Sequence, residues 1–118
     1  KIDGIIPVPL HPSKKRKRGY NQAALIATAL SEKLKVPLVK KTLIRIKKTQ
    51  SLAHIGYDQR WREVDHAFKS RKTLPLEMKH VLLVDDVITT GATLTACATA
   101  LLKKNPLKLS IVSLACRL

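Results

Sequence analysis

The sequence is poor in aromatic and acidic residues, and both shortages limit what the protein can do. Its 118 residues include one Trp, two Tyr and one Phe, so few rings are available to stack on nucleobases. Only 8 Asp and Glu oppose 23 Lys and Arg, which gives a formal net charge of +15. Such an excess attracts polyanions in general: nucleic acids, acidic membrane surfaces or multiply phosphorylated metabolites. The charge by itself does not choose among them.

Other shortages exclude whole classes of protein. No apolar run approaches the roughly 18 residues of a membrane span, and the first residues do not have the pattern of a signal peptide. We therefore expect a cytoplasmic protein with no membrane insertion. The two cysteines, Cys97 and Cys116, lie apart in apolar segments, which indicates neither a disulfide framework nor a zinc site. The length fits one domain over residues 1–118, and the lack of an initiating Met indicates a fragment of a longer chain.

The most informative stretch is residues 81–95, because an apolar run is followed at once by two acids and a polar turn. Residues 81–84 are four branched apolar residues without alternation, as in a parallel strand that is buried on both faces. Asp85 and Asp86 follow, so we expect them at the carboxyl end of this strand, where open α/β sheets bind ligands. A hydroxyl-rich loop then leads into a helix with an apolar face.

This combination suits a specific ligand. The N–H groups at a helix start favour a phosphate group, together with Thr hydroxyls and a Gly that lets the backbone approach closely or take a positive φ. Two adjacent carboxylates accept hydrogen bonds but repel phosphate. Their natural partners are therefore sugar hydroxyls, or a divalent cation that the sugar also contacts. The pattern predicts a site for a ribose 5-phosphate group.

At these positions the sequence resembles the type I phosphoribosyltransferase family, whose signature is four apolar residues, two acids and a Thr-rich loop with a Gly. The resemblance implies that Asp85 and Asp86 hold the ribose hydroxyls of phosphoribosyl pyrophosphate, and that Mg2+ arrives on the ligand near these acids without a direct protein cage. It also implies a 5-phosphate loop made of Thr89, Thr90, Gly91, Ala92 and Thr93. A metal-holding ATPase strand fits less well, because no GxxxxGK[ST] stretch is present. Acids that merely end a buried strand are the plain structural alternative.

The first part of the chain predicts a second loop at the same edge of the sheet. Residues 4–10 start as a strand that Pro7 and Pro9 must end, because proline cannot donate to a strand ladder. A helix over residues 23–35 and a short strand over 38–44 are expected further on. Between the first strand and the helix lie the candidates for contact with pyrophosphate or nucleic acid: Leu10, His11, Lys14, Lys15, Arg16, Lys17 and Arg18. Their charge fits a leaving-group site and a solvated DNA-binding loop about equally well.

A narrower resemblance covers nearly the whole chain. Residues 7–11 and 18–23 resemble the ComF/GntX branch of the phosphoribosyltransferases, and residues 45–68 resemble its mobile loop. The resemblance implies four mobile-loop candidates: Arg45, Thr49, Gln50 and Arg60. The branch commonly has an Asn soon after the loop Arg, where this chain has Arg62 and Glu63, so no role is carried over to that position. Without the resemblance, the same stretch fits a surface excursion equally well.

The expected fold is α/β, with a small, mostly parallel sheet flanked by helices, as two strand-helix units and a final strand require. We also expect a surface connector over residues 69–80 and a last strand over 109–114. The resemblance strengthens this expectation to a type I phosphoribosyltransferase-like core. It also implies an N-terminal cysteine zinc module in the branch, which these 118 residues do not contain.

Three functions compete. The first is an enzyme that displaces pyrophosphate from phosphoribosyl pyrophosphate with Mg2+, and the second is a non-catalytic phosphoribosyl or nucleotide sensor. The third, implied by the ComF resemblance, is a competence factor that contacts single-stranded DNA during DNA uptake. The expected partners are phosphoribosyl pyrophosphate and, for the third function, single-stranded DNA, with a homodimer as a further candidate assembly. The sequence indicates neither a catalytic residue nor the acceptor of the phosphoribosyl group.

Overall fold

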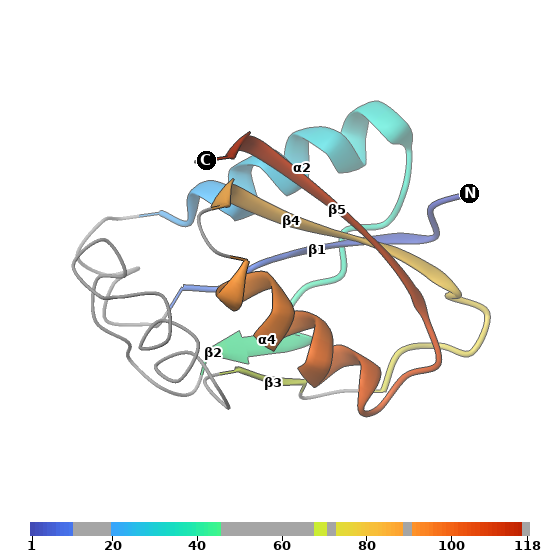
Figure 1. Ribbon diagram of the computed structural model, residues 1–118. Coiled ribbons are helices and arrows are strands. Elements are labelled where there is room, and N and C mark those ends of the chain that lie inside the picture. The colour runs from blue at the N-terminus through green and yellow to red at the C-terminus, as the bar shows by residue number, and fades with distance from the viewer. Residues whose placement is uncertain (11–19, 46–67, 71–72, 89–90, 117–118) are drawn as a thin grey trace.

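Three parallel strands form the central sheet, in the order β1-β4-β5. β1 spans Gly4–Pro7, β4 spans His80–Ile88 and β5 spans Lys108–Cys116 (Figure 1). The computed structural model describes residues 1–10, 20–45, 68–70, 73–88 and 91–116. Within these residues, the predicted α/β fold with a parallel sheet flanked by helices is confirmed.

β4 lies in the middle of this sheet and pairs with both neighbours. It pairs with β1 in parallel, and the backbone N–H of Val8 extends this ladder by donating to the carbonyl of Val84 at 2.8 Å. Pro9 follows and cannot donate a further bond, so pairing ends there as the sequence predicts. β5 pairs in parallel with β4 from one end of β4 to the other. The carboxyl ends of β1, β4 and β5 therefore meet at one edge of the sheet.

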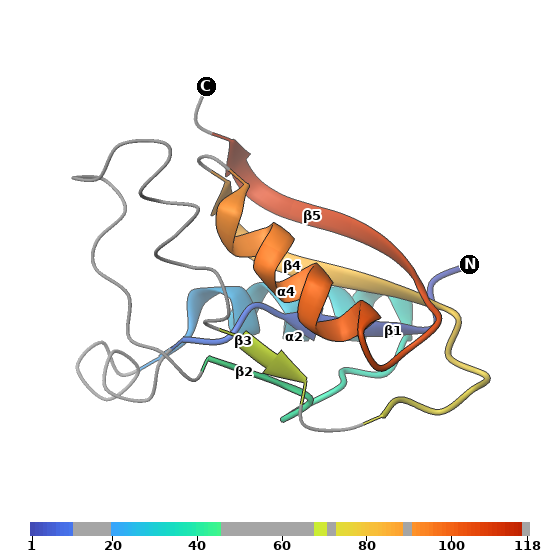
Figure 2. The same ribbon diagram turned by 60° about the horizontal axis from the view of Figure 1, so that its bottom comes forward.

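Each face of the sheet is covered by one helix. α2 (Gln22–Leu34) covers one face, where Ile5, Ala27 and Val84 form a small buried cluster. α4 (Ala92–Leu102) covers the other face together with a two-stranded antiparallel ribbon, β2 (Leu43–Arg45) and β3 (Phe68–Ser70) (Figure 2). The larger buried cluster lies on this side: Ile6, Val8, Leu43, Phe68, Leu74, Val81, Leu83, Leu94, Cys97, Ala100 and Leu101. In the described part of the chain, neither helix has the length and apolar character needed to cross a membrane.

The start of α2 is tied to the end of β1 by one side chain. Asn21 Oδ1 accepts a hydrogen bond from the N–H of Ala23 at 3.0 Å, which caps the helix. Asn21 Nδ2 donates to the carbonyl of Val8 at 3.1 Å. The helix ends at Leu34, and Lys35 takes a left-handed backbone conformation with φ 56°. The helix predicted over residues 23–35 is confirmed to within a residue at each end.

The strand predicted over residues 38–44 is wrong in extent. Leu38 makes only an isolated parallel bridge to Ile5, and regular pairing begins at Leu43. The intervening residues turn away from the first sheet, and Lys41 has a positive φ of 60°. The segment thus changes from the edge of β1 to a separate ribbon, which a run of apolar residues alone does not reveal.

The connector predicted over residues 69–80 is wrong at its start. Phe68–Ser70 forms β3, with Phe68 and Ser70 buried and Lys69 exposed, and it pairs antiparallel with β2. A single alternation over three residues is too short to stand out as a strand in sequence. The pairing joins residues that lie far apart in the chain, so local patterns could not predict it.

β5 forms one edge of the central sheet in the part of the chain that the structure describes. Its residues 109–116 include no charged residue, although the chain as a whole carries +15. Ile111 is 50 % exposed and Leu114 is 68 % exposed. At the opposite edge, residues 37–39 cover β1, because Ile5 exchanges backbone hydrogen bonds of 2.9 and 2.8 Å with them. The two edges of the sheet therefore differ in how well they are protected.

Candidate functional site

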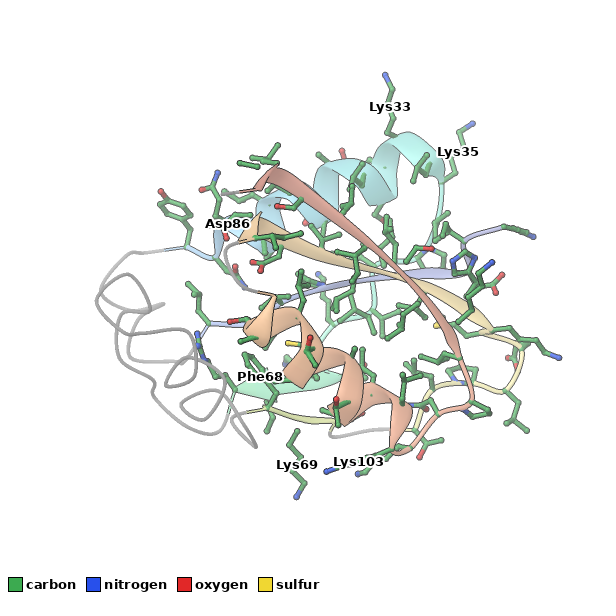
Figure 3. All side chains as sticks on the ribbon, in the orientation of Figure 1. Lys33, Lys35, Phe68, Lys69, Asp86 and Lys103 are labelled. Carbon is green, nitrogen blue, oxygen red and sulfur yellow. The ribbon has the colours of Figure 1, made fainter. Side chains whose placement is uncertain are left out.

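The two acids of the sequence motif lie inside β4 and not after it, because pairing with β5 continues to Ile88. Successive side chains of a strand point to opposite faces, so Asp85 continues the buried row of Val81 and Leu83 on the α4 side. Asp85 is only 9 % exposed, whereas Asp86 is half-buried at the carboxyl end of the strand (Figure 3). The motif therefore supplies one buried acid and one more accessible acid at the expected edge of the sheet.

The carboxyl group of Asp85 has a raised pKa. Its Oδ1 accepts a hydrogen bond from the backbone N–H of Asp86 at 2.9 Å. Burial raises the pKa of Asp85 to about 6, and a side-chain hydrogen bond and charge repulsion from Asp86 act in the same direction. The backbone hydrogen bond and the attraction of Arg45 oppose this rise in pKa. A ligand that donates hydrogen bonds to Asp85 would favour its charged form.

The helix after the acids begins at a glycine with a left-handed backbone. Gly91 has φ 86° and ψ 0°, and its carbonyl accepts a hydrogen bond from the N–H of Thr95 at 2.9 Å in the first turn of α4. A Cβ built on Gly91 would meet no described atom within 4 Å beyond its chain neighbours. No described residue beyond the chain neighbours of Gly91 therefore obstructs the approach of a ligand group to this position. The positive end of the helix dipole favours an anion at that place.

Three of the five residues expected around the phosphate are described. Besides Gly91, Ala92 is 1 % exposed, so only its backbone could face a ligand, and Thr93 is half-buried. Thr89 and Thr90 lie outside the described residues. The described part of the loop therefore offers backbone groups and one Thr side chain.

Arg45, which the sequence indicates only as a mobile-loop candidate, is a neighbour of Asp85. It is the last residue of β2, opposite Phe68 of β3, and its guanidinium carbon lies 5.1 Å from the centroid of the Phe68 ring. Burial lowers the pKa of Arg45, while the nearby Cys97 and Asp85 raise it. The family resemblance predicts a mobile-loop role, but Arg45 itself lies in a strand. Leu43 and Arg45 lie two residues apart and so on one face of a strand, but a three-residue strand is too short for this spacing to predict it.

Cys97 lies on α4 in the buried cluster and is 0 % exposed. Burial raises the pKa of its thiol, and the charge of Asp85 adds to the effect. A thiol kept protonated in this way is a poor nucleophile. Cys97 is therefore a small core residue.

The remaining predicted site residues are described only in part. Leu10 is half-buried and lies just beyond β1, whose last bond reaches Val84, so the chain leaves β1 at the same edge as the acids. Outside the described residues lie His11, Lys14, Lys15, Arg16, Lys17, Arg18, Thr49, Gln50 and Arg60.

A metal ion would find few protein ligands here. Among the described residues, no group of three or more His, Cys, Asp or Glu side chains is placed to hold a metal. Two neighbouring carboxyl groups do fit Mg2+ that arrives on phosphate oxygens and keeps part of its water shell. The residues present are thus compatible with a cation carried by the ligand.

Comparison with known proteins agrees with this geometry. Residues 20–117 match the family model described as a phosphoribosyl transferase domain. "Competence protein F" of Haemophilus influenzae is 35 % identical over 116 residues, which cover 96 % of this chain and 50 % of that protein. "DNA utilization protein YhgH" of Escherichia coli K12 is 33 % identical over 103 residues, or 87 % of this chain and 44 % of that protein. "Competence protein ComFC" of Bacillus subtilis is 31 % identical over 104 residues, or 86 % of this chain and 39 % of that protein.

The chain spans half or less of the length of these curated relatives. Their names bear out the predicted resemblance to the ComF branch. The family match covers β2 through β5 and α2, and so includes both acids, Gly91 and Arg45. The chain belongs to the phosphoribosyl transferase domain family.

Proposed function

We propose that this chain is a ribose 5-phosphate-binding domain of a protein that works in the uptake or use of DNA. One observation carries the binding part of the proposal. Asp85 and Asp86 lie near the carboxyl end of β4, and the next described residue after β4 is Gly91, which has a positive φ and no described atom within 4 Å of a built Cβ beyond its chain neighbours. Hydroxyl acceptors and an anion-binding helix start thus occur within one strand-helix connection.

The ligand that would use both features is phosphoribosyl pyrophosphate. Its 5-phosphate would lie at the first turn of α4, near the backbone of Gly91 and Ala92 and the hydroxyl of Thr93. Its ribose hydroxyls would donate to the carboxylates of Asp85 and Asp86. Bound Mg2+ would offset the charge of the pyrophosphate and hold it in one geometry. In an active enzyme, an acceptor would displace pyrophosphate from the anomeric carbon, and the acids would stabilise the positive charge that develops on the ring.

The cellular part of the proposal is supported by the relatives. Three of them are named for competence or for DNA utilization, and each shares about a third of its aligned residues with this chain. Ribose phosphates are the units of nucleic acids and of the nucleotides released from them. A domain that binds this group is therefore suited to a protein that handles incoming DNA.

The binding test compares thermal unfolding with and without ligand. Phosphoribosyl pyrophosphate with Mg2+ should stabilise the chain by about 2.7 kcal/mol at a hundredfold excess over its dissociation constant, and ribose 5-phosphate should also stabilise it. Free ribose, which lacks the phosphate, should have little effect. Asp85→Asn with Asp86→Asn should remove the stabilisation. Glu32→Gln with Glu77→Gln changes two exposed acids and alters the net charge equally, so this control should keep it. Equal stabilisation of both double variants would exclude the site.

Direct contact with single-stranded DNA is a second candidate function, favoured by the net charge of +15 and by the names of the relatives. The four lysines labelled in Figure 3 do not lie along one track. Figure 3 shows Lys33 and Lys35 projecting from the end of α2, and Lys69 and Lys103 projecting from the other side of the molecule. A focused backbone contact would therefore depend on the five consecutive cations of residues 14–18.

The DNA test follows affinity as a function of salt. Binding to single-stranded DNA should fall with salt along a log-log slope of roughly −0.7 per phosphate contacted. Replacing Lys14, Lys15 and Lys17 by Ser should flatten the slope more than replacing Lys33, Lys69 and Lys103 by Ser, although both variants lose three charges. Equal slopes in the two variants would show that binding follows net charge alone. No binding even at about 20 mM salt would rule out direct DNA contact by this domain.

A further inference from the structure

Asp85 and Arg45 both lie next to the larger buried cluster, each on a strand that contributes to it. On β4, Asp85 continues the inward row of Val81 and Leu83. On β2, Arg45 continues the inward direction of Leu43, which belongs to the same cluster. The alternation of both strands therefore directs Arg45 and Asp85 toward one space, where their opposite charges raise the pKa of Arg45 and lower that of Asp85. The placement follows from backbone geometry and does not depend on a flexible surface contact.

The position of Arg45 is fixed from its own side as well. Phe68, directly opposite on β3, is 6 % exposed and presents its ring to the guanidinium at 5.1 Å. A cation over an aromatic face at this distance is attracted by the ring. The buried ring cannot move far, because it packs in the cluster with Leu43 and α4. The ribbon thus presents a half-buried cation toward the acids.

We infer that Arg45 is a positioning residue of the site, which acts through Asp85 by offsetting its charge and holding its carboxylate for the ligand. Among the residues that the structure describes, the titratable or charged groups that act on Asp85 are Asp86 on β4, Arg45 on β2 and Cys97 on α4. Arg45 is the cation among them. Two carboxylates repel a phosphorylated ligand, and the positive charge of Arg45 near Asp85 reduces that repulsion. The part of this inference that concerns the ligand rests on the proposed function.

The first test needs no ligand. We would measure unfolding in urea at pH 7.5 for wild type, Arg45→Gln, Asp85→Asn and the double variant. If the two side chains act on each other, the double variant should be more stable than the sum of the single effects predicts, by about tenfold in the unfolding equilibrium constant. Additive effects would overturn the inference. The cycle of Arg45→Gln with Asp3→Asn is the control, since Asp3 lies before β1 at the other end of the sheet, and it should be additive.

The coupling between Arg45 and Asp85 can be tested even if one variant fails to fold. If Arg45→Gln alone is unfolded, a folded double variant would show the coupling in its strongest form. An unfolded double variant would overturn the inference, because removing the partner charge would then not relieve the defect.

The second test uses ribose 5-phosphate as the probe. Arg45→Gln should weaken its affinity about tenfold, Arg45→Lys should restore part of the loss, and Arg45→Gln should add nothing to Asp85→Asn. An equal loss from Arg45→Gln in the presence and absence of the Asp85 carboxylate would show that Arg45 does not act through Asp85. If wild type binds no ribose 5-phosphate, the proposed function fails, while the unfolding cycle still decides whether Arg45 and Asp85 are coupled.

Discussion

The backbone N–H of Asp86 donates a 2.9 Å hydrogen bond to Oδ1 of the preceding residue, Asp85. This bond favours the charged carboxylate, but burial outweighs it, and the pKa of Asp85 rises to about 6. The side chain proposed to hold a sugar hydroxyl therefore carries a folding cost at neutral pH. Sites that bind polar ligands commonly have such a cost, because the ligand provides the missing interactions.

The first prediction concerns pH. Asp85 has a folded pKa of about 6 and a reference value of 3.8, so the folded state binds more protons between these values, and stability falls as pH rises through them. Asp85→Asn removes this loss. In urea unfolding, the free energy of unfolding of the variant relative to that of wild type should increase by up to about 3 kcal/mol from pH 4 to pH 7.

Asp3 provides a control of opposite sign. Backbone hydrogen bonds from Lys79 and His80 lower the pKa of Asp3, so its contribution is present above pH 3.8 and is lost as pH falls through the lower folded value. The free energy of unfolding of Asp3→Asn relative to that of wild type should therefore not increase from pH 4 to pH 7. If both variants follow the same pH trend, Asp85 does not have the raised pKa.

The second prediction concerns Gly91. Gly91→Ala should destabilise the chain by about 1–2 kcal/mol, because φ 86° is unfavourable for a residue with a Cβ even where nothing obstructs it. Gly91→Asn should cost less, since Asn tolerates the left-handed region. Both should weaken ribose 5-phosphate binding, measured by calorimetry, because their side chains enter the space proposed for the phosphate. Wild-type affinity in Gly91→Ala would place the phosphate elsewhere.

The third prediction concerns Asn105, which is 3 % exposed. Its Oδ1 accepts a hydrogen bond from the N–H of Leu74 at 2.7 Å, and its Nδ2 donates to the carbonyl of Leu101 at 2.8 Å. Asn105→Ala should cost about 1–3 kcal/mol in chemical unfolding, because the buried N–H of Leu74 loses this bond, whereas the carbonyl of Leu101 still accepts from backbone N–H groups. Thr99→Ala, at an exposed position of α4, should change stability by less than about 0.5 kcal/mol. Similar effects of the two substitutions would contradict the linking role of Asn105.

The fourth prediction concerns residues 46–67. Arg45 and Phe68 are directly opposite in the ribbon, so a two-residue Asn-Gly turn can join them in place of the natural stretch. The shortened chain should keep its circular dichroism spectrum and unfold at a similar or higher temperature, because a shorter loop costs less entropy to close. An unfolded product would mean that residues 46–67 stabilise the core.

The same shortened chain tests the mobile-loop candidates. It lacks Thr49, Gln50 and Arg60 but keeps Arg45. Retained binding of ribose 5-phosphate would show that the three removed residues are not needed for that ligand. Loss of phosphoribosyl pyrophosphate binding alone would assign them to the pyrophosphate side.

Local patterns were enough to predict α2, α4 and the strands of the parallel sheet, since each has a run of residues with one period. They were not enough for the β2–β3 ribbon. Its strands are three residues long and pair across a separation of more than 20 residues, so neither period nor proximity indicates them. The resemblance gave Arg45 a loop role, and only the pairing of Arg45 with Phe68 shows that it lies in a strand.

The acids illustrate the same limit at the site. Two adjacent carboxyl groups after an apolar run predict the end of a strand, whereas both acids lie inside β4, which continues to Ile88. The sequence could not indicate that Asp85 is buried while Asp86 is more exposed. That difference depends on α4 and the ribbon, which pack on the face toward which Asp85 points. The chemical difference between the acids therefore arises from tertiary packing.

The uncharged edge strand β5 has a consequence for the behaviour of the chain at high concentration. Copies that each carry +15 repel one another at low ionic strength, over a Debye length of about 10 Å at 0.1 M salt. At 1 M salt this length falls to about 3 Å, and sulfate also strengthens apolar contact, so the strand edges with Ile111 and Leu114 can meet. Light scattering should therefore show self-association that rises with salt. Ile111→Lys with Leu114→Lys should suppress it, because pairing of the strand edges would then have to desolvate two charged side chains, a cost that salt does not remove.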